Sequence, residues 1–353
     1  MFRLVKHILL VKRWIVVNSA FAIGFILVWV WILPSLPKVH IESEKMVGDI
    51  PLFFGQIVGG YGIIWFLTAV LVKNKPRLKY VDVAFNYLCN LSCPFCFAKV
   101  LKSHSHQKMT LDGHERFCEQ AMKLGAYHFD FQGGEPLLNY EELKVLIKAY
   151  KPKRNYISVT TNGLLLTAKK IVELKKLGVD LFILSVNSES DLAKAVLLLV
   201  QGVRPVLNFI VSHYSVRTKL FVDLATFAKE EGVLVNCLWA VSVGGWRNTE
   251  EAMLNEEDKQ LFYNMQKRFP LRRDLEANFG GYGCGAVKEA VYLTPWGDVY
   301  ACPFIHKSLG NVKQEPLETI RERGLEIPCF SQYHPKCLVA EDREILKDAS
   351  LLT

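Results

Sequence analysis

Three cysteines occur within eight residues of the chain, as Cys89, Cys93 and Cys96. Thiolates this close in sequence can converge on one inorganic centre, and cysteine thiolates are the usual ligands of iron–sulfur clusters. A 4Fe–4S cube has four irons, so three cysteines leave one iron open for another ligand. Two alternatives remain: free cysteines, and a zinc site in which His104 or His106 supplies the fourth ligand that structural zinc takes.

Three short polar motifs follow the cysteines along the chain. Their residues are Gly133, Gly134 and Glu135, then Thr161 and Asn162, and then Ser185 and Asn187. Glycine lets the backbone approach a ligand closely, and a glutamate can pair with a cationic amine. Each motif is also an ordinary turn sequence, so none of them identifies a binding site when it is taken alone.

Short apolar segments alternate with amphipathic segments from residue 78 onward. Strands are expected near 79–87, 127–132, 155–161, 180–187, 204–211 and 233–240, and helices near 110–124, 139–150, 166–177, 189–200 and 217–231. This alternation predicts an α/β fold with a parallel sheet and right-handed crossovers. About six repeats, fewer than the eight of a closed TIM barrel, predict a partial (β/α)6 TIM-like barrel. The cysteines and the polar motifs then follow the carboxyl ends of strands, where sites in parallel sheets lie.

Together these motifs resemble those of the radical S-adenosylmethionine (radical SAM) superfamily, over most of residues 78–242. The C-x3-C-x2-C spacing, with the aromatic Phe95 before the last cysteine, is similar to the cluster motif of that family. The resemblance implies a 4Fe–4S cluster whose open iron binds SAM. It also implies an oxidoreductase-type enzyme that reductively cleaves SAM to methionine and a 5′-deoxyadenosyl radical, which abstracts hydrogen from a substrate.

The three polar motifs occur in the order in which the family has its SAM-binding segments. Glu135 and the two glycines before it look like the GGE motif, which implies a contact with the methionine amino group of SAM. Thr161 and Asn162 look like the TNG turn of the family. Ser185 and Asn187 are similar to a Ser-x-Asp segment that contacts the SAM ribose or carboxylate, although Asn187 has a neutral amide where an aspartate is common.

Four further cysteines lie towards the end of the chain, at Cys284, Cys302, Cys329 and Cys337. Twelve residues separate Cys284 from Gly297, and four more separate Gly297 from Cys302. This spacing resembles the opening of the SPASM and twitch extensions of radical SAM enzymes, which implies an auxiliary 4Fe–4S cluster on the four cysteines. A four-cysteine zinc site is the alternative. We expect residues 243–353 to form a separate, small cysteine-rich domain without a long helix.

Two uncharged apolar runs, 14–33 and 51–72, precede the barrel, and each is long enough to span a bilayer. Basic residues flank the outer ends of the two runs, namely Arg3, Lys6, Lys12, Arg13, Lys73, Lys75, Arg77 and Lys79. The positive-inside rule therefore predicts two transmembrane helices in the cell membrane, with both chain ends and the catalytic domain in the cytoplasm. A cleaved signal peptide is the alternative for the first run, and a buried core helix for the second. The expected domains are a membrane anchor at 1–76, the barrel at 77–242 and the C-terminal domain at 243–353.

The composition agrees with this organisation. The chain has 353 residues, enough for about two ordinary domains. Half of its residues are hydrophobic, its mean hydropathy is +0.16 and its net charge is +8. The eight basic residues beside the apolar runs equal that excess, so the charge indicates an anionic bilayer surface, and no nucleic acid partner is expected. The nine cysteines lack the spacing of a small disulfide scaffold, which favours a reducing compartment.

The substrate is predicted less directly than the chemistry. The membrane hairpin favours a lipid or an isoprenoid of the bilayer. A peptide- or protein-modifying maturase is the alternative, because many peptide-modifying relatives of the resembled family carry an auxiliary-cluster extension. A non-catalytic membrane electron carrier is a third possibility, but it does not account for the three polar motifs. For the enzymes, we expect a cytoplasmic flavodoxin- or ferredoxin-type protein as the electron donor.

Overall fold

The computed structural model describes residues 76–103, 107–274 and 283–342. The chain divides into two units between Asn74 and Lys75, so all described residues belong to the second unit. The two predicted membrane spans, 14–33 and 51–72, lie outside these residues. Among the residues that the structure describes, no helix combines the length and the hydrophobicity needed to cross a bilayer.

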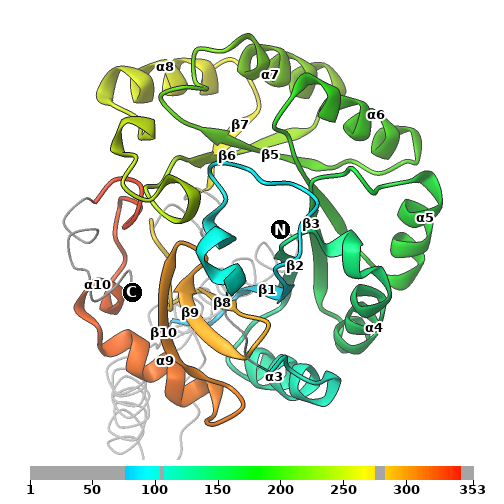
Figure 1. Cartoon of the computed structure of the whole chain (residues 1–353), viewed down its shortest axis with the longest axis vertical. Coiled ribbons are helices and arrows are strands. Elements are labelled where there is room, and N and C mark those ends of the chain that lie inside the picture. Colours follow the sequence, from blue (N-terminus) through cyan, green and yellow to red (C-terminus); the bar gives the residue numbers. More distant parts are fainter. Residues whose placement is uncertain (1–75, 104–106, 275–282, 343–353) are drawn as a thin grey trace, which may run out of the picture. The chain divides into compact units, whose positions relative to one another are not determined.

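A ten-stranded sheet organises the second unit, in the order β10-β9-β8-β1-β2-β3-β4-β5-β6-β7. Its parallel strands β1 to β6 are β1 (Tyr80–Asn86), β2 (His128–Gly133), β3 (Tyr156–Thr161), β4 (Leu181–Ser185), β5 (Val206–Val211) and β6 (Leu234–Trp239). The helices between them are α3 (Leu111–Lys123), α4 (Tyr140–Tyr150), α5 (Ala168–Leu177), α6 (Leu192–Val200) and α7 (Lys219–Glu231). Figure 1 shows the sheet curved into an open ring with these helices on its outer side. The predicted parallel α/β sheet is confirmed, and each of these elements lies close to its expected bounds.

The two faces of β1 differ in polarity. Val81, Val83 and Phe85 belong to the apolar core between the sheet and the outer helices. Successive side chains of a strand point to opposite faces, so Asp82 faces the interior of the ring. Asp82 is in register with Asp130 of β2, and both are almost completely buried. Buried carboxyl groups therefore line part of the inner face of the ring.

Threonine side chains begin three of the outer helices. Thr110, Thr167 and Thr218 each accept a hydrogen bond from a backbone N–H of the first turn. These bonds satisfy amide groups that have no partner inside the helix. Helices α5 and α7 end at Gly178 and Gly232, which adopt the left-handed conformation that commonly ends a helix.

The C-terminal residues extend the same sheet. β7 (Leu271–Arg273) pairs with β6, and β8 (Ala290–Leu293) pairs with β1, in both cases parallel. β9 (Asp298–Cys302) and β10 (Ile305–Asn311) add antiparallel strands beyond β8. Edge strands expose backbone N–H and C=O groups, and this pairing satisfies them. The expectation of a separate domain at 243–353 is therefore corrected, because strands from before and after residue 243 belong to the same sheet.

Helices also form in this region, where the sequence indicated no long one. They are α8 (Glu256–Gln266), α9 (Leu317–Glu326) and the short α10 (Pro328–Ser331). A capping box begins α8, because the Asn255 side chain accepts from the Asp258 amide and the Asp258 carboxylate accepts from the Asn255 amide. Short 3-10 segments complete the fold, namely η3 (Phe97–Ser103), η4 (Pro136–Asn139), η5 (Lys151–Lys153), η6 (Glu189–Asp191), η7 (Gly244–Trp246) and η8 (Glu250–Ala252).

Candidate active site

The loop with the first three cysteines begins directly after β1. Cys89, Cys93 and Cys96 have partly exposed side chains. The Leu91 amide donates to Cys89 Sγ at 3.4 Å, and the Cys96 amide donates to the Cys93 carbonyl at 3.2 Å. The loop continues into η3, which Figure 1 draws in cyan within the outline of the ring. The thiols thus follow the carboxyl end of a strand, as predicted.

Two glycines at the end of β2 support this loop. The Gly134 amide donates to the Asn86 carbonyl at 2.9 Å. A Cβ atom on Gly134 would overlap the carbonyl oxygen of Leu88, just before Cys89. Gly133 has a φ of +123°, a backbone conformation that side-chain-bearing residues rarely adopt. The glycines therefore let the end of β2 lie against the segment that leads into the cysteine loop, a packing role that the motif by itself did not reveal.

Glu135 joins the end of β2 to the end of β3. Its side chain is buried, and it accepts hydrogen bonds from Thr161 Oγ1 (2.7 Å), the Asn162 amide (2.8 Å) and the Leu137 amide (3.0 Å). Burial raises the pKa of Glu135, and these donors partly counteract that rise. A carboxylate offers about four acceptor sites, so one more donor can still be bound.

Asn162 connects the third strand to the cysteine loop. Its side-chain amide donates to Asn90 Oδ1 at 2.8 Å and lies 4.0 Å from Cys89 Sγ. The backbone amide of the same residue is the one that binds Glu135. The structure therefore brings the cysteine loop, the GGE motif and the TNG turn together, although 73 positions separate Asn162 from Cys89.

Ser185 and Asn187 are connected differently. Ser185 ends β4, is half-buried and is in register with Asn208 of β5. The Asn187 side chain is exposed, and the backbone amide of this residue donates to the Asp191 carboxylate at 2.7 Å. In the described part of the chain, neither side chain forms a hydrogen bond with the cysteine loop. Their contact with SAM stays a prediction.

Comparison with protein families identifies this region. Residues 83–244 match the model of the radical SAM superfamily, and they include the three-cysteine loop and all three polar motifs. Residues 83–244 are a radical SAM domain. The prediction of a radical SAM enzyme is confirmed at the level of this domain, and the domain implies a 4Fe–4S cluster and SAM as cofactors.

Individual proteins resemble parts of the chain. Over 109 residues it is 32% identical to GTP 3′,8-cyclase of Clostridium acetobutylicum, which covers 30% of this chain and 34% of that relative. SuiB of Streptococcus suis bound to precursor peptide SuiA has a TM-score of 0.58 and 17% identity, over 75% of this chain and 69% of SuiB. The structure of anSMEcpe with AdoMet and Cp18Cys peptide has a TM-score of 0.52 and 20% identity, over 72% of this chain and 82% of that protein. At such low identity the two structures show a common fold.

Two glycines that the sequence analysis did not single out also contact the cysteine loop of the radical SAM domain. They lie in η7, after β6, and the Gly245 amide donates to the Cys96 carbonyl at 3.0 Å. A Cβ atom on Gly245 would overlap the Pro94 carbonyl. The Trp246 ring lies 5.6 Å from that of Phe95, edge to face. In the sequence, two adjacent glycines could have indicated this contact, because glycine permits a close backbone approach that other residues prevent.

The buried side chain of Asn86 shows whether the site is suited to a bound cofactor. The residue is 1% exposed, and neither its side-chain oxygen nor its nitrogen has a hydrogen-bond partner in the described structure. Buried amides are normally paired, so this one indicates a ligand group that completes the site. Asn86 stands three residues before Cys89, and the nearby donor set of three thiols suits an iron–sulfur cluster. The radical SAM domain therefore fits its implied cofactors.

The spacing of the thiols is a further property of the site. Among the described residues, no three His, Cys, Asp or Glu side chains are arranged to hold one metal ion. In a 4Fe–4S cube each cysteine binds a different iron, so its ligands surround a larger volume than those of a single ion.

Backbone amides donate to three of the four C-terminal cysteines, namely Cys284, Cys302 and Cys337. Cys302 Sγ accepts from the amides of Phe304 and Ile305. Cys337 Sγ accepts from those of Val339 and Ala340. Such donors favour the thiolate form.

Cys284 brings two of these segments together. Its Sγ accepts from the amides of Ala286 and Leu338, and its own amide donates to the His334 carbonyl at 2.6 Å. Burial raises the pKa of Cys284, and it raises that of Cys337 to about 12. The charge of Cys284 also acts on Cys302 and Cys337. The Leu338 amide that binds Cys284 directly follows Cys337 in the chain.

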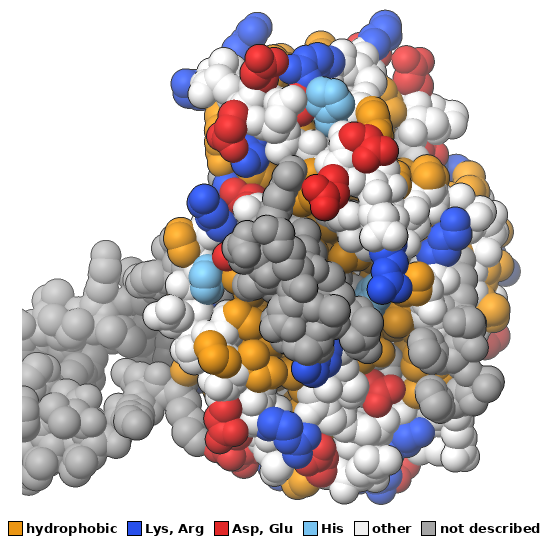
Figure 2. Space-filling view, turned by 60° about the vertical axis from the view of Figure 1, so that its left-hand side comes forward, with side chains coloured by type: hydrophobic (Ala, Val, Ile, Leu, Met, Phe, Trp, Pro, Cys, Tyr) orange, Lys and Arg blue, Asp and Glu red, His pale blue; other side chains and the backbone are white. Residues whose placement is uncertain are grey.

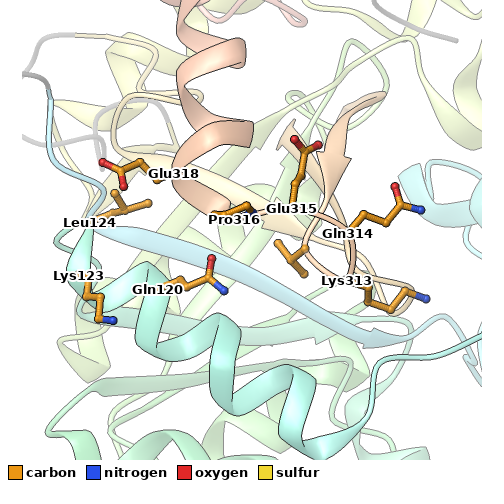
Figure 3. A pocket seen from close by; sticks show the side chains of 9 residues that line it. Gln120, Lys123, Leu124, Lys313, Gln314, Glu315, Pro316 and Glu318 are labelled. Carbon is orange, nitrogen blue, oxygen red and sulfur yellow. The ribbon is translucent and has the colours of Figure 1, made fainter.

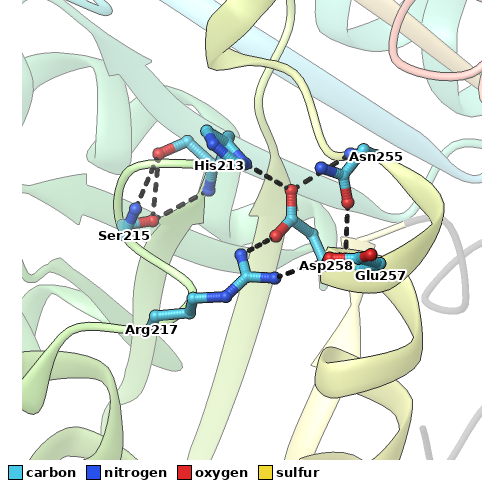
Figure 4. A network of polar contacts seen from close by, with 7 residues as sticks. His213, Ser215, Arg217, Asn255, Glu257 and Asp258 are labelled. Carbon is cyan, nitrogen blue, oxygen red and sulfur yellow. Dashed lines mark hydrogen bonds and ion pairs between the residues drawn. The ribbon is translucent and has the colours of Figure 1, made fainter.

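A polar network lies beyond the end of β5 (Figure 4). Asp258 is fully buried, and its carboxylate accepts from His213 Nδ1 at 2.8 Å, from the Asn255 amide at 3.1 Å and from Arg217. Burial alone would raise the pKa of Asp258, but these donors lower it below its ordinary value. The network ties the loop after β5 to the start of α8.

A cavity of about 420 Å³ lies apart from these motifs, beside α3 (Figure 3). Gln120 and Lys123 line it from α3, and Lys313, Glu315 and Glu318 line it from the segment around the end of β10 and the start of α9. The cavity contains no cysteine and no residue of the polar motifs, so it is not part of the radical SAM site.

Proposed function

We propose that this protein reductively cleaves SAM at a 4Fe–4S cluster held by Cys89, Cys93 and Cys96. The observation that carries the proposal is the direct link from the cysteine loop through Asn162 to Glu135. When bound and reduced, the cluster supplies one electron, which splits SAM into methionine and a 5′-deoxyadenosyl radical that takes a hydrogen atom from the substrate. A flavodoxin- or ferredoxin-type protein is the proposed source of that electron.

The residues of the chain would orient SAM. Three thiolates would anchor three irons and would leave the fourth iron open for the amino and carboxylate groups of SAM. Glu135 has one acceptor site left for an N–H of that amino group, and Asn86 has an amide with both a donor and an acceptor to offer. Both side chains are buried, and hydrogen bonds formed away from water contribute more strongly to binding.

The test is SAM cleavage by anaerobically reconstituted full-length protein with a strong reductant. Wild type should form 5′-deoxyadenosine, and Cys93→Ala should form none, because the cube loses one of its three anchors. Cys118→Ala is the matched control, since this cysteine is buried in the core and belongs to no cluster motif. Normal cleavage by the Cys93 variant would overturn the assignment.

For the substrate, we propose a lipid or isoprenoid confined to the membrane, with residues 14–33 and 51–72 as a membrane hairpin and the catalytic domain in the cytoplasm. Two uncharged runs of this length and the basic residues outside them support the proposal. Anchoring raises the local concentration of a substrate held in the same bilayer. Lipid extracts from cells that express wild type, the Cys93→Ala variant or neither should differ by mass spectrometry only for the wild type.

A peptide or protein substrate is the second candidate. It is favoured by the fold shared with SuiB, whose structure contains a precursor peptide, and with anSMEcpe, whose structure contains a peptide. In the same three strains, unchanged lipids together with a peptide modified only by the wild type would support a maturase and exclude the lipid proposal.

A second metal centre on Cys284, Cys302, Cys329 and Cys337 completes the proposal. The amides around three of these thiols support an auxiliary 4Fe–4S cluster. Reconstituted wild type should then hold about eight irons, and a variant with Ala at Cys89, Cys93 and Cys96 about four. Zinc in place of the remaining iron would identify a structural zinc site instead.

A further inference from the structure

Lys288 is a buried cation in the turn that precedes β8. The residue is 1% exposed. Its ammonium group donates to the carbonyl oxygens of Phe330 at 2.9 Å and of Ala286 at 3.3 Å. Within the part of the chain that the structure describes, no carboxylate forms an ion pair with it. A buried charge is costly unless an opposite charge compensates it.

The carboxylate of the next residue, Glu289, forms its hydrogen bonds with other side chains. Glu289 accepts from Lys79 Nζ at 2.5 Å and from the Tyr333 hydroxyl at 2.8 Å. The Tyr333 ring lies 5.4 Å from the Lys288 ammonium, a weak cation–π contact that does not neutralise the charge. Glu289 also acts on the charge of Lys288, but less than Cys284 and Cys329 do. Its own charge is already paired with that of Lys79.

The thiols of the C-terminal cysteines are the available source. The two carbonyls that Lys288 binds lie beside these cysteines, because Phe330 adjoins Cys329 and Ala286 follows Cys284 by two residues. The charges of Cys284 and Cys329 also act on that of Lys288. The sulfur of Cys284 accepts hydrogen bonds from two backbone amides, as metal-bound thiolates can. Four thiolates carry more negative charge than a zinc ion or an oxidised cube neutralises, so a metal centre on them has a net negative charge.

We propose that Lys288 is the counter-charge of the metal–thiolate centre on Cys284, Cys302, Cys329 and Cys337. The inference rests on the second metal centre of the proposed function. A positive charge beside the centre stabilises its thiolates, so it strengthens metal binding. If the centre is an iron–sulfur cluster, the charge also favours the reduced form, which is the more negative one, and so raises the reduction potential.

The test compares Lys288→Gln with Lys288→Arg in reconstituted full-length protein. The first substitution keeps a donor for the two carbonyls but removes the charge, whereas the second keeps the charge. Lys336→Gln is the control, because this lysine adjoins Cys337 in sequence but is exposed, so that solvent screens its charge. Far-UV circular dichroism checks that all variants are folded.

Two readouts are measured, each also in the background with Ala at Cys89, Cys93 and Cys96. In an EPR-monitored redox titration, Lys288→Gln should shift the ratio of oxidised to reduced C-terminal cluster at least tenfold towards the oxidised form. This is about 59 mV for a one-electron couple. In competition with a chelator, Lys288→Gln should release the C-terminal metal at a chelator concentration about tenfold lower than the wild type requires. The charge-retaining Lys288→Arg and the control Lys336→Gln should leave both readouts unchanged.

The outcomes separate the two proposals. Wild-type potential and wild-type metal retention in Lys288→Gln would overturn the role of Lys288. Zinc in the background variant would refute the auxiliary iron–sulfur cluster, and the chelator competition would then still decide whether Lys288 compensates the thiolates.

Discussion

The substitution Asp130→Asn tests the view that the interior of the ring holds uncompensated carboxyl groups. Asp130 accepts hydrogen bonds from Ser158 Oγ at 2.5 Å and Thr160 Oγ1 at 2.7 Å. Burial raises its pKa to about 6, and the two hydroxyl donors only partly oppose this. The Asp82 carboxyl in register with it also has a raised pKa, because it is buried and because the charge of Asp130 acts on it.

The sign of the effect follows from the two pKa values. The folded protein binds the proton of Asp130 up to a pH of about 6, whereas the unfolded chain releases it at a pH of about 3.9. Stability is therefore lost as the pH rises from about 4 through 6. Two pKa units amount to about 3 kcal/mol at pH 8, and about half of this loss is already present at pH 5. An asparagine has no proton to lose, keeps one acceptor for a hydroxyl and avoids the whole loss.

The assay is thermal unfolding of wild type and Asp130→Asn from pH 5 to pH 8. The variant should be more stable at pH 8 by about 3 kcal/mol, or roughly 6–12 °C in Tm, and the difference should halve at pH 5. Asp112→Asn is the control, because this exposed residue should leave the pH profile unchanged. A variant that is less stable than wild type at pH 8 would refute the reasoning, since it would mean that a cation compensates the Asp130 carboxylate.

Three further predictions concern the cluster loop, the network around α8 and the membrane. Gly134→Ala should lower the iron content of the N-terminal cluster by at least half, because the added methyl group would displace Leu88. The control Gly113→Ala has room for its methyl group and should retain all iron. Equal iron contents in the two variants would contradict this prediction. Asp258→Asn should destabilise the protein by about 1–3 kcal/mol at pH 7 in urea unfolding, since Arg217 loses its buried partner. Because folding lowers the pKa of Asp258, its contribution to stability is present above the pKa of the unfolded chain and is lost as the pH falls below about 4. A stability difference between wild type and Asp258→Asn that persists in acid would argue against the ion pair. Reporter fusions at the C-terminus should be active in the cytoplasm, and an external reporter signal would contradict the proposed hairpin.

The elements with local signals could be predicted from the sequence. Short apolar runs and the amphipathic segments between them identified β1 to β6 and α3 to α7. The cysteine spacing was equally local, because eight residues contain all three thiols of the loop. The GGE and TNG motifs were recognisable for the same reason. Each depends on residue types within one short segment.

How these segments pack against one another could not be predicted from the sequence and is seen only in the tertiary structure. No periodicity in the sequence indicates that β8 pairs with β1, since strand pairing depends on exposed edges that exist only after the sheet has formed. The contact of Gly245 with Pro94 and the hydrogen bonds that occupy Glu135 likewise join residues that are distant in sequence. The burial of Lys288 beside thiols has the same origin. Burial and charge compensation are properties of the assembled interior, so they become visible only when the chain has folded.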